Sequence, residues 1–254
     1  MTPRRGLGLC ASAIAALAPH CAPVYVEVHE QPGALDGSAD SSLPDAHEMP
    51  DAGVTDARVD GDAPSDAGGP GCHAGGSRCA FITSVQYGAN LGGLTGADAK
   101  CQARANAANL TGTYKAWLSD STGSPSTRFT QGASGWTLVN GAVIASTYAD
   151  LIDGTVATAL AITELGTRAP AATVCASSAP DGGTYLPPIA WSNTAASGAI
   201  ANVANSCSNW TGVLDGGASW GIADRVDNGW SNGCTTGSAT GCTSYVASLY
   251  CFEQ

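Results

Sequence analysis

The clearest periodic pattern of apolar residues lies between residues 96 and 109. Four of them recur at helical spacing and would share one face of a helix: Ala97, Cys101, Ala105 and Ala108. Thr95 is followed three residues later by Asp98, which is the pattern of a capping box at a helix start. The sequence therefore predicts a helix over residues 96–109. Its Cys101 points into the core, where a structural disulfide is favoured over a reactive thiol.

Other runs of the chain predict short strands. Residues 78–87, which read RCAFITSVQY, are rich in β-forming residues. In residues 113–121, TYKAWLSDS, alternate positions are apolar, as in a half-buried strand. Residues 136–146, WTLVNGAVIAS, predict a hairpin, because the Asn140-Gly141 dipeptide supplies the positive φ angles that a two-residue connection needs.

Regular structure is sparse in the rest of the chain. Residues 147–154, TYADLIDG, predict one helical turn or two, and residues 165–243 are rich in Gly, Ser, Thr and Asn. Residues 244–254, SYVASLYCFEQ, predict a final strand. One main helix among short strands and long loops is an α+β domain of low regular content.

Composition divides the chain near residue 70. All six Trp and all three Phe follow residue 80, so one aromatic core is expected there. Residues 22–70 hold eleven acids and one base, a net charge of −10, whereas ten acids and seven bases from residue 71 onward give −3. With few large apolar residues, segment 22–70 predicts a disordered acidic linker. Neither part has the basic stripe that nucleic acid binding needs, so we expect no nucleic acid partner.

The first 21 residues have the parts of a short export signal. Two arginines precede the apolar run GLGLCASAIAALA, which is too short to cross a bilayer. Two processing routes stay open. One is cleavage at a small-x-small pattern that Pro19 follows directly, and the other is lipidation of Cys21, although His20 departs from the small residue that lipoprotein signals prefer. Either route gives an exported protein, whose membrane contact would be a lipid anchor.

Cysteine usage agrees with export. Apart from Cys10 and Cys21, the chain has eight: Cys72, Cys79, Cys101, Cys175, Cys207, Cys234, Cys242 and Cys251. An even number in an exported domain predicts a disulfide framework. A zinc site is disfavoured, because no C-x-x-C spacing occurs among these eight and His73 is the only histidine in this region.

Several stretches of the sequence resemble a known family. Residues 92–121, GGLTGADAKCQARANAANLTGTYKAWLSDS, are similar to the start of the endostatin fold, the C-terminal domain released from collagen, in the C-type-lectin-like superfamily. The landmarks continue through LVNGAVIASTYADLIDG, IAWSNT, SCSNWTG and GCTSYVASLYCFEQ. Bacterial endostatin-like domains on exported myxobacterial and leptospiral proteins look closer still. The resemblance covers residues 79–254 and implies an endostatin-like, C-type-lectin-like domain over residues 71–254.

The resemblance also implies disulfide pairings. Two are those of the animal family: Cys101–Cys251, which would tie the helix to the last strand, and Cys207–Cys242. The four cysteines without a counterpart in that pattern then pair by elimination as Cys72–Cys79 and Cys175–Cys234.

Much of the family's ligand chemistry has no counterpart in this chain. Animal endostatin binds heparin through clustered arginines and zinc through several histidines, whereas the arginines here are scattered and His73 stands alone. The sugar-binding loop motifs of C-type lectins do not occur in the domain. We expect no cofactor or metal; calcium would have to use loop carboxylates that usually face water, namely Asp215, Asp224 or Asp227.

Catalysis is also disfavoured. A Ser-His or Cys-His arrangement has no candidate base within the core, since His73 lies at the edge of the domain. No motif joins the carboxylates that could cleave a glycoside, which are Asp150, Asp153, Glu164 and Asp181. We therefore expect no enzymatic activity.

The preferred hypothesis is a monomeric, tethered binding module that recognises an extracellular protein or glycan. Its candidate surface is the loop over residues 211–234, where Trp220 and Trp230 lie among Gly and Asp, including Asp224 and Asp227. The alternative is that both Trp side chains fill the core. Two other functions remain open: a structural envelope or matrix component without a discrete ligand, and a carboxylate-based hydrolase.

Overall fold

The computed structural model describes residues 71–178, 182–212, 216–237 and 240–254. The expected export signal, the lipidation candidate Cys21 and the linker over residues 22–70 lie outside these ranges. The strands are β1 (Arg78–Ile82), β2 (Tyr114–Ala116), β3 (Trp136–Leu138), β4 (Val143–Ala145), β5 (Ser177–Ser178), β6 (Thr184–Tyr185), β7 (Ile189–Trp191), β8 (Ala218–Ile222), β9 (Cys234–Thr236) and β10 (Ser248–Glu253).

One long helix stands among short helical turns. The α-helices are α1 (Gly93–Ala107), α2 (Pro125–Arg128), α3 (Tyr148–Leu151), α4 (Cys207–Trp210), α5 (Gly229–Asn232) and α6 (Thr240–Ser244), and the 3-10 turns are η1 (Ala74–Gly76) and η2 (Val203–Asn205). The predicted α+β class with one main helix is confirmed. Within the described ranges, no helix is long and apolar enough to cross a membrane.

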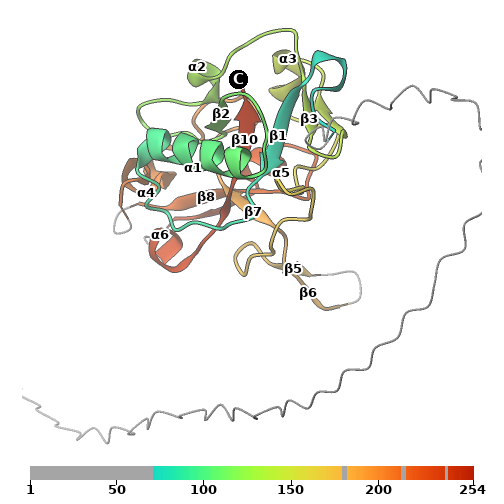
Figure 1. Ribbon diagram of the computed structural model, residues 1–254. Coiled ribbons are helices and arrows are strands. Elements are labelled where there is room, and N and C mark those ends of the chain that lie inside the picture. Colours follow the sequence, from blue (N-terminus) through green and yellow to red (C-terminus); the bar gives the residue numbers. More distant parts are fainter. Residues whose placement is uncertain (1–70, 179–181, 213–215, 238–239) are drawn as a thin grey trace, which may run out of the picture. The chain divides into compact units, whose positions relative to one another are not determined.

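Strand β10 lies in the middle of a mixed sheet whose strand order is β4-β3-β1-β10-β7-β8-β9 (Figure 1). On one side it runs antiparallel to β1, with Phe81 opposite Cys251. On the other side it pairs first with β7 in parallel and then with β2 antiparallel. Strands β5 and β6 form a separate two-stranded sheet. The last strand in chain order therefore joins the two halves of the sheet.

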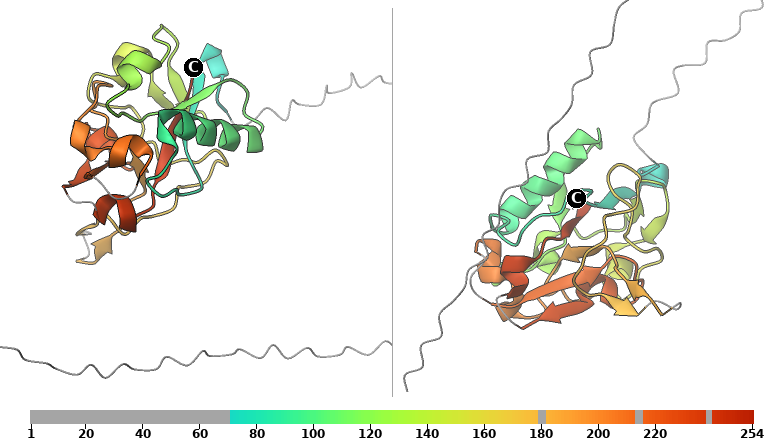
Figure 2. Two further views of the ribbon diagram at one scale, coloured as in Figure 1. Left: turned by 90° about the vertical axis from the view of Figure 1, so that its left-hand side faces the viewer. Right: turned by 90° about the horizontal axis from the view of Figure 1, so that it is seen from below.

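Both faces of β10 are buried. Leu249 and Cys251 belong to the core that α1 covers, whereas Tyr250 and Phe252 belong to a second core on the opposite face. Figure 2 shows α1 lying along one side of the sheet. Burial on both faces explains why the strand SLYCF lacks the alternation of polar and apolar residues that a half-exposed strand would show.

Helix α1 begins earlier than the sequence predicts. Its first residue is Gly93, and Gly92 at the N-cap has φ 83°, which favours glycine. The expected capping box of Thr95 and Asp98 is wrong, because both residues lie inside the helix. Asp98 instead accepts hydrogen bonds from the backbone N–H of Ala116 at 2.9 Å and from the guanidinium of Arg128 at 2.6 Å. Its carboxylate thus fastens α1 to β2 and α2.

The predicted strands are mostly confirmed but shorter. The run 78–87 is regular only to Ile82, after which the hydroxyl of Thr83 donates to the Val85 carbonyl and turns the chain. The hairpin at Asn140-Gly141 is confirmed as β3 and β4, but its connection is longer than two residues and only Gly141 has positive φ. Residues 147–154 contain a single helical turn, α3.

All four expected disulfides are present. The distances between bonded Cα atoms are 5.0 Å for Cys72–Cys79, 5.4 Å for Cys101–Cys251, 5.9 Å for Cys175–Cys234 and 5.6 Å for Cys207–Cys242. Several disulfides in one domain indicate an oxidising, extracellular environment.

The sequence SCSNWTG adopts a left-handed turn. The four residues from Cys207 to Trp210 have φ between 45° and 60°, although none is glycine. Each such residue costs roughly 1–2 kcal/mol, so other contacts must hold the turn. The Cys207–Cys242 bond fixes its start, and the Trp210 indole N–H donates to the Ser119 carbonyl at 2.9 Å.

Candidate functional site

Trp220 and Trp230 are core residues, so the expectation that they are exposed anchors is wrong. Both side chains are completely buried. Residues 218–222 form β8 instead of a loop, and its Trp220 ring packs against Trp191 with centroids 5.2 Å apart. In the short helix α5, Trp230 packs against Trp117 at 4.9 Å in the core on the other face of the sheet. The alternative that these side chains fill the core is confirmed.

The two predicted acids, Asp224 and Asp227, lie on the chain between β8 and α5. Asp227 accepts a hydrogen bond from the Arg225 guanidinium at 2.7 Å and one from the backbone N–H of Gly229 at 3.0 Å. These bonds hold the pKa of Asp227 below its ordinary value, chiefly through Arg225. Asp227 therefore shapes the turn that leads into α5.

Asp224 belongs to a different cluster. Its Oδ2 accepts hydrogen bonds from the Arg168 guanidinium at 2.8 Å and from the Tyr185 hydroxyl, while Arg168 also donates to that hydroxyl at 3.1 Å. The hydrogen bond from Tyr185 to Asp224 raises the pKa of Tyr185, because removing the phenol proton breaks that bond. The separate hydrogen bond from Arg168 to Asp224 raises the pKa of Arg168. The cluster thus joins one guanidinium, one carboxylate and one phenol.

A groove with a volume of about 340 Å³ lies beside this cluster. We call it the hairpin groove, and its lining residues are Cys175, Ser177, Tyr185, Pro187, Ile222, Asp224 and Arg225. Exposed side chains surround it. Arg168 and Arg225 are 56% and 49% exposed, and Tyr185 is 38% exposed.

Three elements position the hairpin groove. The β5–β6 hairpin, which Figure 1 shows at the periphery of the domain, carries Tyr185 opposite Ser177. The end of β8 supplies Ile222, and Asp224 follows it. The Cys175–Cys234 disulfide links the start of the hairpin to the edge strand β9.

Sequence reasoning missed Tyr185 and the role of Arg168. Both lie in the polar stretch that was expected to be loop, and 17 residues separate them, while Arg168 and Asp224 are 56 residues apart. No spacing pattern could join them. The Cys175–Cys234 pairing was the one sequence feature that brought this stretch close to the region of Asp224.

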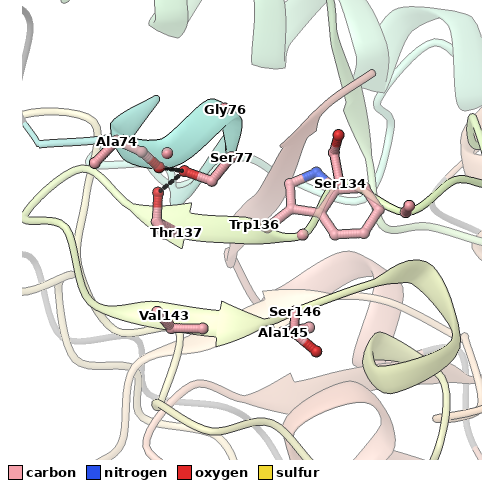
Figure 3. A pocket seen from close by; sticks show the side chains of 12 residues that line it. Ala74, Gly76, Ser77, Ser134, Trp136, Thr137, Val143, Ala145 and Ser146 are labelled. Atoms are coloured by element: carbon pink, nitrogen blue, oxygen red, sulfur yellow. Dashed lines mark hydrogen bonds between the residues drawn. The ribbon is translucent and has the colours of Figure 1, made fainter.

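The larger cavity lies elsewhere, between η1, β4 and the chain that enters β3, with a volume of about 390 Å³ (Figure 3). Small residues dominate its lining, and the hydroxyls of Ser77, Thr137 and Ser146 form hydrogen bonds within the protein. The Ser77 hydroxyl binds the Ala74 carbonyl at 2.9 Å and the Thr137 hydroxyl at 3.2 Å, as Figure 3 shows. The guanidinium of Arg78 lies 3.7 Å from the Trp136 ring centre and donates to the Thr130 carbonyl. This cavity offers a ligand little specific chemistry.

The acids considered for hydrolysis have local partners. Glu164 is buried and forms an ion pair with Arg104, and it accepts hydrogen bonds from the backbone and hydroxyl of Ser84. Asp150 accepts from Ser146, and Asp153 accepts from Thr155. These bonds stabilise turns and join α1 to the chain after β1. Asp181 lies outside the described residues.

Calcium ligation by the predicted acids has no geometric support in the part of the chain that the structure describes. There, no group of three or more His, Cys, Asp or Glu residues could hold a metal ion. Asp215 lies outside that part. Asp224 and Asp227 bind different arginines.

Comparison with known proteins adds no assignment. No protein-family model matches this chain, and no curated protein matches it.

Proposed function

We propose that the chain is an exported, non-catalytic binding module and that the hairpin groove is its recognition surface. The module would have the endostatin-like, C-type-lectin-like fold that the sequence resembles. This assignment is supported by the α+β architecture, by the single long helix and by the two disulfides that the resemblance implies. The four disulfides support export, and lipidation at Cys21 would supply a membrane anchor.

The exposed Tyr185, flanked by Arg168 and Arg225 at one groove, is the observation that carries the proposal. Tyr and Arg are enriched at protein recognition surfaces, because each combines a large contact area with directional hydrogen bonds. Two exposed apolar residues are the chain neighbours of residues that line the groove. Leu186 is 38% exposed and Val226 is 47% exposed, each next in sequence to a lining residue.

The composition of this surface favours a protein ligand over a glycan. The two arginines are balanced by Asp224 and Asp227, so the surface carries no net charge that would select a polyanion. A neutral surface with aromatic and aliphatic side chains suits a partner that buries apolar area.

Array binding with matched leucine variants tests this function. An array of extracellular matrix proteins and glycans is incubated with the labelled wild type and with Leu186→Ser, which removes the exposed apolar side chain between the lining residues Tyr185 and Pro187. Leu165→Ser is the control, because Leu165 is also exposed, at 57%, and neither Leu165 nor its two chain neighbours line the groove. We expect saturable binding to a protein spot that falls at least tenfold in Leu186→Ser and is unchanged in Leu165→Ser.

Other outcomes of this experiment contradict the proposal in different ways. Equal loss in both leucine variants would place the recognition surface elsewhere. Binding confined to glycan spots would overturn the choice of a protein ligand. If no spot binds saturably, the protein is better explained as a structural envelope component.

A further inference from the structure

We infer that Cys175–Cys234 is a site of thiol–disulfide exchange, at which a thiol can open the base of the β5–β6 hairpin while the rest of the domain stays folded. The inference concerns a covalent modification and is independent of any ligand of the hairpin groove. It rests on differences between this disulfide and the other three.

Solvent access separates this bond from the others. Cys175 and Cys234 are both partly exposed, and Cys175 lines the hairpin groove. The remaining six disulfide cysteines are buried, with exposures of 7% for Cys72, 1% for Cys242 and 0% for Cys79, Cys101, Cys207 and Cys251. Exchange requires a thiolate to reach a sulfur atom, so an attacking thiol meets this bond first.

The backbone at Cys175 gives a second difference. Cys175 has φ 63°, in the left-handed region that residues with a side chain seldom adopt. Cys207 has a similar angle, but its side chain is fully buried, whereas that of Cys175 is partly exposed. Once the bond is open, Cys175 is free to leave this unfavourable backbone conformation.

The consequence of opening is local, because the hairpin contributes little to either core. Its described residues with assigned exposure, Ser177 and residues 182–186, are all exposed. Besides the disulfide, hydrogen bonds hold its base: the Tyr185 hydroxyl binds Asp224 and Arg168, and the Ala172 N–H donates to the Pro187 carbonyl at 3.0 Å. Cys175 and Cys234 pack against the edge of one core, but residues 177–178 and 184–186 of the hairpin belong to neither core.

The exchange needs an external reductant, which we take to be a low-molecular-weight thiol. Its thiolate attacks Sγ of Cys175, forming a mixed disulfide and releasing the thiolate of Cys234. A second thiol then attacks the reductant sulfur of the mixed disulfide and releases Cys175. The reductant leaves as its own disulfide, and its two thiol protons pass to the two cysteines, so two electrons enter the protein.

Graded reduction of the full chain tests this site. The folded, oxidised protein is treated with increasing glutathione, the exposed thiols are alkylated, and mass spectrometry gives the fraction of each cysteine modified. We expect Cys175 and Cys234 to be labelled at least tenfold faster than the six buried cysteines, with Trp fluorescence unchanged. Earlier labelling of another pair, or loss of all four bonds together with unfolding, would overturn the inference.

Chymotrypsin digestion tests the release of the hairpin. Cleavage after Tyr185 should accelerate at least fivefold on selective reduction, while cleavage after the exposed Leu165, which lies outside the hairpin, stays constant as an internal control. The double variant Cys175→Ser with Cys234→Ser should show the faster cleavage without any reductant. Unchanged cleavage after Tyr185 in that variant would show that the disulfide does not restrain the hairpin.

Discussion

Cys101 in α1 and Cys251 in β10 are bonded to each other although 150 residues separate them in sequence, and both side chains are completely buried. The bond joins the long helix to the central strand of the sheet. Cys72 and Cys79, in contrast, are only 7 residues apart. The two bonds therefore restrict the unfolded chain to very different extents.

Removing the long-range bond should destabilise the domain more than removing the short one. In the chain-entropy account, replacing Cys101 and Cys251 by Ala lowers the free energy of unfolding by about 5 kcal/mol, and replacing Cys72 and Cys79 by Ala lowers it by about 2 kcal/mol. Urea unfolding followed by Trp fluorescence measures both losses. Equal losses would show that the restriction of the unfolded chain does not determine the stabilisation.

The paired rings of Trp117 and Trp230 should respond differently to the same substitution. The Trp117 indole N–H donates to the Ser231 hydroxyl at 2.7 Å, whereas the buried Trp230 indole N–H has no partner in the described structure. Trp117→Phe therefore loses a hydrogen bond that Trp230→Phe does not. We expect Trp117→Phe to cost about 1 kcal/mol more. Thermal unfolding measures the difference, and an equal or reversed order contradicts this reading of the core.

The sequence predicted the helix because helical spacing is a local pattern. It predicted the disulfide pairings because the family resemblance implies them. Alanine and cysteine at helical spacing define the buried face of α1, and Ala97, Cys101 and Ala105 are indeed completely buried. Register and pairing order in the sheet could not be derived from the sequence. Because β10 is apolar on both faces, its pattern specifies neither the register of the strand nor its neighbours.

The candidate site was predicted only in part. Asp224 was identified as part of a binding loop with Trp220 and Trp230, but both tryptophans are buried in the core. Aromatic residues in a stretch rich in Gly and Asp resemble an exposed loop, and only the pairing of β8 with β7 shows otherwise. Tyr185 and Arg168 reach Asp224 from separate segments, so tertiary structure alone brings them together.

The phenol of Tyr185 provides a spectroscopic test of the cluster. Its hydrogen bond to Asp224 raises its pKa, so Asp224→Asn should move that pKa down toward the ordinary value of 10.0. Absorbance of the phenolate against pH, with the Tyr185→Phe spectrum subtracted, isolates this residue. If the pKa of Tyr185 is the same in the wild type and in Asp224→Asn, the hydrogen bond is not formed in solution.

Asp150 should make stability depend on pH in the acidic range. Its carboxylate accepts hydrogen bonds from the backbone N–H of Ser146 at 2.6 Å and from its hydroxyl at 2.8 Å, and the backbone bond is the main cause of a pKa below the ordinary 3.8. The folded pKa is thus lower than the unfolded one. The stabilising effect is complete above the unfolded pKa and is lost as the pH falls through the folded pKa.

The matching variant is Asp150→Asn. Its melting temperature should lie below that of the wild type by a constant amount between about pH 7 and pH 5, and the gap should close as the pH falls below about 4. Thermal unfolding at a series of pH values measures this gap. A gap that widens on acidification would contradict the depressed pKa of Asp150.

The position of β10 has a consequence for biosynthesis. Strands β1, β2 and β7 precede it in the chain, and each pairs directly with it. Until the ribosome has added Ser248–Glu253, these three strands lack the neighbour that aligns them, and Cys101 lacks its partner. The domain therefore completes its sheet and its longest disulfide loop only after Ser248–Glu253 has been synthesised.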